Sequence, residues 1–245
     1  MLIYHRVPIP PHFNDALKLQ KLEIAKAFKS LRQHTCSNHS ELLLASKNRF
    51  LKSYVMMNTR CVVVDKTVCL MKNFDMLNHQ FHSNVFLEST STGVVVKSNE
   101  IIPSHSQVFL SYGPHDNLFL LLQYGFICLE NPFDIIDISS FIISILSPSQ
   151  CSLLQSNGYY GDYCITASGL NYRTKVALFL IEFHYFNILV DDIRFRTTKR
   201  IYNHFISMYT EYNQLLSLKG HSFILTQLCA LYTCHLKLLN ELLSN

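Results

Sequence analysis

Apolar side chains recur every three to four residues near the start of the chain, which predicts two helices. Residues 1–13 are expected to be extended, because their three prolines disfavour a helix. Asn14 is then expected to cap a helix that runs to about Gln33. The apolar face of this helix consists of Leu17, Leu22, Ala25, Phe28 and Leu31. A second helix is expected to begin near Ser40 and to extend toward Arg60.

The pattern changes to short β-branched runs after the second helix, which predicts strands. Two such runs, at 61–64 and 67–70, flank a polar pair of residues. Residues 85–97 read as a hairpin with a Ser/Thr/Gly turn, and residues 107–112 (QVFLSY) as another strand. A proline and an acidic residue then open a short helix, which a glycine ends within 114–125.

Helical spacing returns after about residue 130, with broad apolar faces and little strand signal. The expected helices are 137–146, 173–190, 198–218 and 223–243. The pattern therefore predicts an α+β fold in two parts. Residues 1–130 would form a mixed, β-rich domain, and residues 131–245 would form an all-helical domain.

Composition indicates a packed protein in a reducing compartment. Hydrophobic residues make up 49% and charged residues 16%, and the net charge of +4 is too small and dispersed to imply nucleic acid by itself. The eight cysteines permit disulfides, but the chain does not open with a signal-peptide pattern, so free buried thiols are expected. Cys229, Cys234 and His235 fit no common zinc spacing, so no metal is expected. The apolar segment 176–190 is short and interrupted by polar residues, which favours a buried helix over a membrane span.

Two short stretches place polar side chains in apolar surroundings. The first is Phe74-Asp75-Met76-Leu77-Asn78-His79, and the second is 107–126 (QVFLSYGPHDNLFLLLQYGF), in which Tyr112 ends the predicted strand. Each has an ordinary structural explanation when taken alone. Asn-His after an apolar run is typical of a turn or cap, and Tyr before Gly-Pro is typical of a sheet edge.

Together and in this order, these stretches resemble the SET domain of protein-lysine methyltransferases. The resemblance is to the subfamily that includes the Rubisco large-subunit methyltransferase, and it is near-continuous over residues 54–132. Its motifs are Asn58-Thr59-Arg60, Asp75-Met76-Leu77-Asn78-His79, Ser111-Tyr112-Gly113-Pro114-His115-Asp116-Asn117, Leu121-Leu122-Gln123-Tyr124-Gly125-Phe126 and Asn131-Pro132. The resemblance implies a partial SET β-fold with a helical insertion, followed by a helical substrate-binding domain.

The resemblance also implies roles for particular residues. Asn78 and His79 would hold S-adenosyl-L-methionine, the methyl donor. Tyr112 would line the methyl-transfer channel as the catalytic side chain and also contact the donor, and Phe126 would pack beside the donor. Arg60 and Asp75 would lie near the substrate. The implied partner is a protein with a target lysine, histone or non-histone, in the nucleus or cytoplasm, without a membrane or a specific nucleic acid.

One motif of the family does not occur in the sequence. A complete SET domain carries a Gly-x-Gly motif whose bare backbone lets the donor approach closely. The chain has seven glycines, of which Gly93 is the first, and no Gly-x-Gly. The sequence is therefore expected to lack the N-terminal part of the SET domain, with a donor affinity far below that of the family.

Two alternatives to catalysis remain open. One is a non-catalytic protein, derived from a SET domain, that binds a protein partner through its helical half. The other is a nucleic-acid contact through the basic run 194–200 (RFRTTKR), although a solvated loop between helices explains the same residues.

Overall fold

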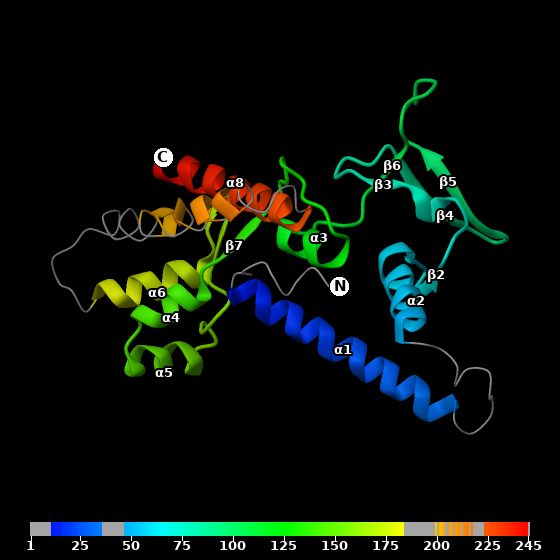
Figure 1. The fold of residues 1–245 in the computed structure, drawn as a ribbon. Helices are drawn as coiled ribbons and strands as arrows, with labels where there is room; N and C mark the ends of the chain where they lie inside the picture. The colour runs from blue at the N-terminus through cyan, green and yellow to red at the C-terminus, as the bar shows by residue number, and fades with distance from the viewer. Residues whose placement is uncertain are drawn as a thin grey trace. The chain divides into compact units, whose positions relative to one another are not determined.

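The computed structural model describes residues 11–35, 47–183, 199, 201–203, 206–207, 209–211, 213–215, 217 and 223–244 (Figure 1). These residues fall into two compact units. The first takes the described residues up to Pro114 together with Leu122–Tyr124, and the second takes His115–Leu121 and the described residues from Gly125 onward. A domain boundary near residue 130 stays a prediction.

The first unit begins with two helices, α1 (Pro11–Thr35) and α2 (Lys47–Arg60). They contact each other through Phe28 and Phe50, whose ring centroids lie 5.0 Å apart. The predicted cap at Asn14 is wrong, because α1 already begins at Pro11. Proline is tolerated in the first turn, since the N–H it lacks would have no helical partner there. The end of α2 at Arg60 is confirmed, whereas its expected start near residue 40 lies outside the described residues.

Short strands make up the rest of the first unit. They are β1 (Val62–Val64), β2 (Thr67–Cys69), β3 (Asn78–His79), β4 (Val85–Thr90), β5 (Gly93–Ser98) and β6 (Phe109–Leu110), with a 3₁₀ turn, η3 (Phe74–Met76), before β3. The predicted hairpin at 85–97 is confirmed as the antiparallel pair β4–β5. The strands predicted at 61–64 and 67–70 are confirmed by β1 and β2, which also pair antiparallel. Asp65 and Lys66 both have positive φ in the β1–β2 turn, as a tight primed turn requires. The strand expected at 107–112 is only two residues long, and it pairs in parallel with β3.

The second unit contains a small sheet among helices, which corrects the expectation of an all-helical part. Strands β7 (Ile135–Asp137), β8 (Cys164–Thr166) and β9 (Gly169–Leu170) form an antiparallel sheet. Its helices include α4 (Ser139–Ile145), α5 (Pro148–Ser156), α6 (Tyr172–Phe183) and α8 (Phe223–Ser244). Helix α3 (Asn117–Gln123) has residues in both units. Strands of two or three residues are too short to show a period, so the sequence pattern did not reveal them.

The helices expected at 137–146 and 223–243 are confirmed by α4 and α8, and the one expected from 173 by α6 as far as Phe183. The rest of that third segment, 184–190, lies outside the described residues. The described residues of 198–218 are helical. Helix α5 was not expected, although it opens with a capping box in which Ser147 and Gln150 satisfy each other's backbone N–H groups.

Buried apolar side chains concentrate in the second unit. Ile136 and Ile165 of the sheet are fully buried, and so are residues along α8, namely Leu225, Leu228, Leu231 and Leu239. In the first unit the described buried apolar side chains are Phe13, Phe74 and Val85. All seven cysteines within the described ranges are free thiols. Among the described helices, none combines the length and apolarity needed to cross a bilayer.

Candidate active site

Two segments that are distant in the sequence meet at the β3–β6 pair (Figure 1). Asn78 lies opposite Phe109, and His79 lies opposite Leu110. The Gln80 N–H donates to the Leu110 carbonyl oxygen at 3.1 Å, which continues the pairing by one residue. The polar stretch at 74–79 and the end of the strand at 107–112 therefore lie side by side, as the resemblance implies.

Tyr112 is held at this junction by two hydrogen bonds. Its backbone N–H donates to Nδ1 of His79 at 3.0 Å, and its hydroxyl donates to the Leu77 carbonyl oxygen at 2.7 Å. The His79 and Tyr112 ring centroids are 5.1 Å apart. Because Nδ1 accepts this bond, it carries no proton in this arrangement. The side chain of His79 therefore fixes the backbone of the residue that ends β6.

A cavity of about 340 Å³ lies beside Tyr112. Its lining comes from α2, β1, η3, β4, β6 and the end of α3, through Thr59, Arg60, Cys61, Val62, Val63, Phe74, Asp75, Leu77, Leu87, Leu110, Ser111, Tyr112 and Tyr124. Most of these side chains are apolar, and two phenols stand among them. The ring centroids of Tyr112 and Tyr124 are 4.8 Å apart. This volume falls within the range of small-molecule pockets.

Both phenols are neutral at physiological pH, and burial raises the pKa of each above its ordinary value. The pKa of Tyr112 is raised, first by desolvation and then by the nearby Tyr124, while Arg60 opposes the shift. The pKa of Tyr124 is raised by desolvation. Neutral tyrosine hydroxyls can both donate and accept hydrogen bonds. The cavity thus offers hydrogen bonding without a negative charge on either phenol.

Arg60 and Asp75 form part of the cavity wall. The Arg60 guanidinium donates to the Asp75 carbonyl oxygen at 3.0 Å and lies 3.5 Å from the carboxylate oxygen Oδ2. It also lies 2.9 Å from the sulfur of Met76. These contacts tie the C-terminal end of α2 to η3, which directly precedes β3. The pair therefore sets the spacing between two sides of the cavity.

The residues expected in the site are only partly brought together. Arg60, Asp75 and Tyr112 line the cavity, whereas Asn78 and His79 lie on β3 just beyond its lining residue Leu77. Asn78 is exposed and His79 is half-buried. Phe126 belongs to the second unit, and its role beside the donor stays a prediction.

The sequence interpretation missed Tyr124. It stood within the motif Tyr124-Gly125-Phe126, where Phe126 alone received a role. The local signal was available, because Gly125 has a positive φ of 86° and ends α3, which fixes where the preceding tyrosine lies. The function of His79 in holding Tyr112 was also unexpected, since the resemblance assigned it only to the donor.

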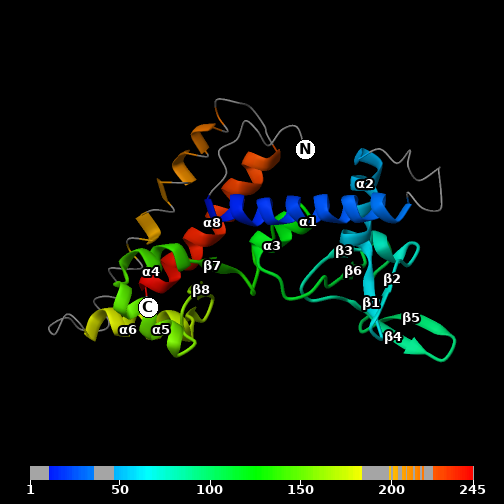
Figure 2. The same ribbon diagram turned by 90° about the horizontal axis from the view of Figure 1, so that it is seen from below.

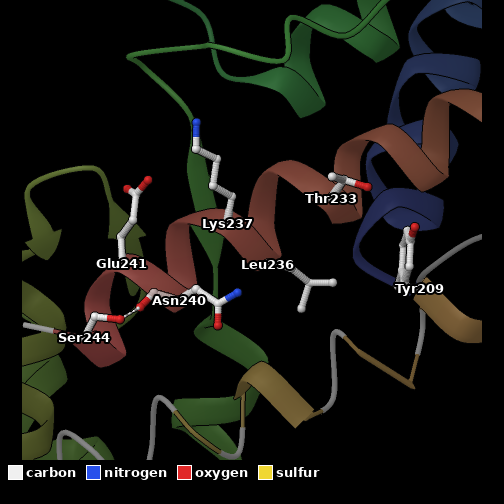
Figure 3. A pocket seen from close by; sticks show the side chains of 7 residues that line it. All are labelled: Tyr209, Thr233, Leu236, Lys237, Asn240, Glu241 and Ser244. Carbon is white, nitrogen blue, oxygen red and sulfur yellow. Dashed lines mark hydrogen bonds between the residues drawn. The ribbon is translucent and has the colours of Figure 1, made fainter.

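A second cavity of about 600 Å³ lies along α8 in the second unit (Figure 3). Polar side chains line most of it, and Figure 3 shows Lys237 and Glu241 pointing to one side of the helix and Asn240 to another. Its remaining lining residues are Tyr209, Thr233, Leu236 and Ser244. It contains no paired nucleophile and base among its described residues, so no chemistry is assigned to it.

Comparison with known proteins agrees with this geometry. The family model of the ribosomal lysine N-methyltransferase 2 C-terminal domain matches residues 134–245. The chain is 32% identical over 136 residues to ribosomal lysine N-methyltransferase set11 of Schizosaccharomyces pombe, covering 53% of this chain and 35% of that protein. It is 29% identical over 157 residues to SET domain-containing protein 4 of Mus musculus, covering 56% and 36%. The chain thus matches about a third of the length of these relatives.

A solved structure has the same fold. It is the crystal structure of the SET domain of LSMT bound to lysine and AdoHcy, with a TM-score of 0.56 and 13% identity. The match covers 95% of this chain and 63% of that one. The chain is thus similar in sequence to SET domain-containing protein 4 and to the ribosomal lysine methyltransferases. Its fold is similar to that of a SET domain.

Proposed function

We propose that the chain forms the lysine-binding and methyl-transfer part of an S-adenosyl-L-methionine-dependent protein-lysine N-methyltransferase. The observation that carries this proposal is the placement of the Tyr112 hydroxyl. It lies on the wall of a largely apolar cavity and donates its proton to a backbone carbonyl oxygen at the edge of β3. Similarity to proteins named lysine N-methyltransferases and SET domain-containing protein 4 supports the reaction class.

The chemistry requires a neutral lysine. With an ordinary pKa of about 10.4, loss of the ammonium proton at pH 7 costs about 4.6 kcal/mol. An apolar cavity lowers this cost, because desolvation disfavours the charged ammonium and depresses the lysine pKa. The walls that Val62, Leu87 and Leu110 contribute would have this effect.

Tyr112 would orient the amine without removing its proton. Because its own hydroxyl hydrogen points to the Leu77 carbonyl oxygen, the phenol oxygen is left to accept an N–H of the substrate amine. Its raised pKa keeps the phenol neutral, so it acts here as an acceptor and not as a base. Holding the amine lone pair in line with the methyl group accounts for catalysis by orientation.

The residues present fit the methyl donor in part. The donor supplies an electrophilic methyl group on a sulfonium. The Asn78 amide is exposed and can hydrogen-bond a polar end of such a ligand. The neighbouring His79 holds Tyr112 in place. We assign Asn78, His79 and Tyr112 to donor binding. Phe126 is proposed to pack beside the donor, and Arg60 and Asp75 to shape the lysine side of the cavity.

The proposed substrate is a lysine of an intracellular protein. Relatives named ribosomal lysine N-methyltransferases favour a ribosomal protein over a histone. The test is methyl transfer from labelled S-adenosyl-L-methionine, at millimolar donor, to purified ribosomal proteins and histones in parallel. Methyl-lysine would be identified by mass spectrometry.

Tyr112→Phe is the decisive variant, and Tyr172→Phe is its matched control, because Tyr172 is a 68% exposed tyrosine in the other unit. Loss of the hydroxyl that orients the amine should lower the rate by roughly 100-fold or more, while the control should keep the full rate. Label transfer that is equal in both variants would overturn the role of Tyr112.

A non-catalytic interaction protein is the second candidate. It is favoured by the family match to residues 134–245, which covers the helical half. The same samples separate the two functions. Specific binding of a purified ribosomal protein, with no methyl-lysine at any donor concentration, would support the second function and reject the first.

A further inference from the structure

Positive charge is concentrated on the first two helices. Together α1 and α2 contain nine Lys and Arg residues and two Asp and Glu residues, a net charge of +7. The whole chain has a net charge of +4, so all other residues together carry −3. The small net charge of the whole chain therefore does not reveal that α1 and α2 together are strongly basic. The sequence interpretation, which treated the charges as dispersed, did not indicate this.

The basic residues of α1 share one exposed face. At 3.6 residues per turn they fall within an arc of about 140° and extend over about 21 Å of helix. They are Lys18, Lys21, Lys26, Lys29 and Arg32, and all five are exposed. Asp15 falls in the same arc and forms an ion pair with Lys18 at 2.9 Å, so the arc has a net charge of +4. We call these five residues the α1 basic face. Figure 2 shows α1 as one long helix, so the face is continuous along its length.

The contacts of α1 with the protein lie outside this face. Phe28 packs on Phe50 of α2, and the Gln20 amide donates to the Leu122 carbonyl oxygen at 3.3 Å. Phe13 near the start of the helix is 4% exposed. A helix that inserts into a membrane surface needs its apolar face for the lipid. Three leucines of α1 are exposed, Leu19, Leu22 and Leu31, but at 3.6 residues per turn they lie at separate angles around the helix and form no continuous apolar face. The exposed charges are therefore suited to an anionic partner that is contacted from outside.

We infer that the α1 basic face binds the phosphate backbone of a nucleic-acid duplex without sequence specificity. A duplex presents one negative charge per about 1.7 Å of axis, which gives a 21 Å helix face many phosphates to contact. The face carries no exposed aromatic side chain for stacking on bases, so the contact is electrostatic. This inference is independent of the proposed methyl transfer, because it uses none of the cavity residues.

The test is fluorescence anisotropy of labelled RNA and DNA duplexes titrated with the full chain at several salt concentrations. With about four phosphates neutralised, log K should fall with log[salt] at a slope of about −3.6, a loss of roughly 100-fold between 50 and 200 mM salt. Lys26→Glu combined with Lys29→Glu should roughly halve this slope and weaken binding tenfold or more. The matching alanine pair should give a smaller loss, and alanine also keeps the helix intact.

The control is Lys66→Glu combined with Lys175→Glu, which changes the net charge equally at exposed lysines away from α1. Equal loss in the control and the α1 pair would overturn the inference, because only total charge would then matter. Binding to poly-glutamate as tight as to either duplex would reject nucleic acid in favour of an acidic protein. Binding only to anionic vesicles would likewise reject it in favour of a membrane surface. Absence of duplex binding at 50 mM salt would show that the face is merely solvated.

Discussion

Asn117 is the buried polar side chain whose loss should destabilise the second unit most clearly. It is 0% exposed at the start of α3. Its side-chain amide donates to the Asp134 carboxylate and to the Cys128 carbonyl oxygen, each at 2.9 Å. Its carbonyl oxygen accepts from the Cys128 N–H at 2.9 Å. These bonds tie α3 to the segment that leads into β7.

Asn117→Ala removes three hydrogen bonds and leaves their buried partners unsatisfied. Two neutral bonds at about 1 kcal/mol each and one bond to a carboxylate at about 2 kcal/mol give an expected loss of about 4 kcal/mol. The loss is a large fraction of the roughly 5–15 kcal/mol that is typical of a folded domain, about a quarter or more. Burial raises the pKa of Asp134, and hydrogen bonds from Asn117 and from the Ile135 N–H oppose this shift, so loss of the Asn117 amide should raise that pKa further.

Urea unfolding measures this loss. The chain has no tryptophan, so near-UV circular dichroism of the buried Tyr163 and Tyr232 reports on the second unit. Asn157→Ala is the matched control, because the Asn157 amide hydrogen bond to the Leu153 carbonyl oxygen is exposed to solvent. The control should cost less than about 0.5 kcal/mol. A loss below about 1 kcal/mol for Asn117→Ala would refute the energetic reasoning.

Three further outcomes are expected. The pKa of Tyr112 is higher in the folded than in the unfolded protein. Its contribution to stability is therefore present below about pH 10 and is lost as the pH rises through the folded pKa. The unfolding free energy of Tyr112→Phe should thus fall less steeply between about pH 9 and 11 than that of wild type. Desolvation, and then the Asp134 charge, raises the pKa of Cys234 to about 11. Iodoacetamide at pH 8 should therefore label the half-buried Cys69 well before Cys234, as followed by peptide mapping over time. Equal labelling rates would contradict that thiol's burial. Ser147→Ala removes the cap of α5 and should cost about 1 kcal/mol in urea unfolding, while its neighbour Ser149→Ala should cost much less.

Elements with a long, regular pattern could be predicted from the sequence. Helix α8 has many turns of apolar spacing, and the hairpin β4–β5 is marked by two short apolar runs around a Ser/Thr/Gly turn, so both were found. Strands β7 to β9 escaped because two or three residues hold no period, and their identity depends on pairing with distant partners. The start of α1 was misplaced because proline disfavours the interior of a helix but not its first turn.

The candidate site shows the same division. The order of Asn78, His79 and Tyr112 indicated that they converge, and the parallel pairing of β3 with β6 brings them together. The hydrogen bond from the Tyr112 N–H to His79 could not be predicted, because it depends on the side-chain rotamer of His79 and on the register of the β3–β6 pair. Gly125 marks where Tyr124 lies at the end of α3, but the contact between the Tyr124 and Tyr112 rings depends on the fold, so the local signal alone did not reveal the role of Tyr124.

The central claim is that the cavity beside Tyr112 receives the reacting groups of a methyl transfer. A crystal structure of this chain grown with millimolar AdoHcy and a lysine-containing peptide tests it most directly. The account predicts the lysine side chain inside the cavity, its amine within hydrogen-bond distance of the Tyr112 hydroxyl and the AdoHcy sulfur facing that amine. Ligands bound away from Tyr112 and β3, with the cavity empty, would contradict it.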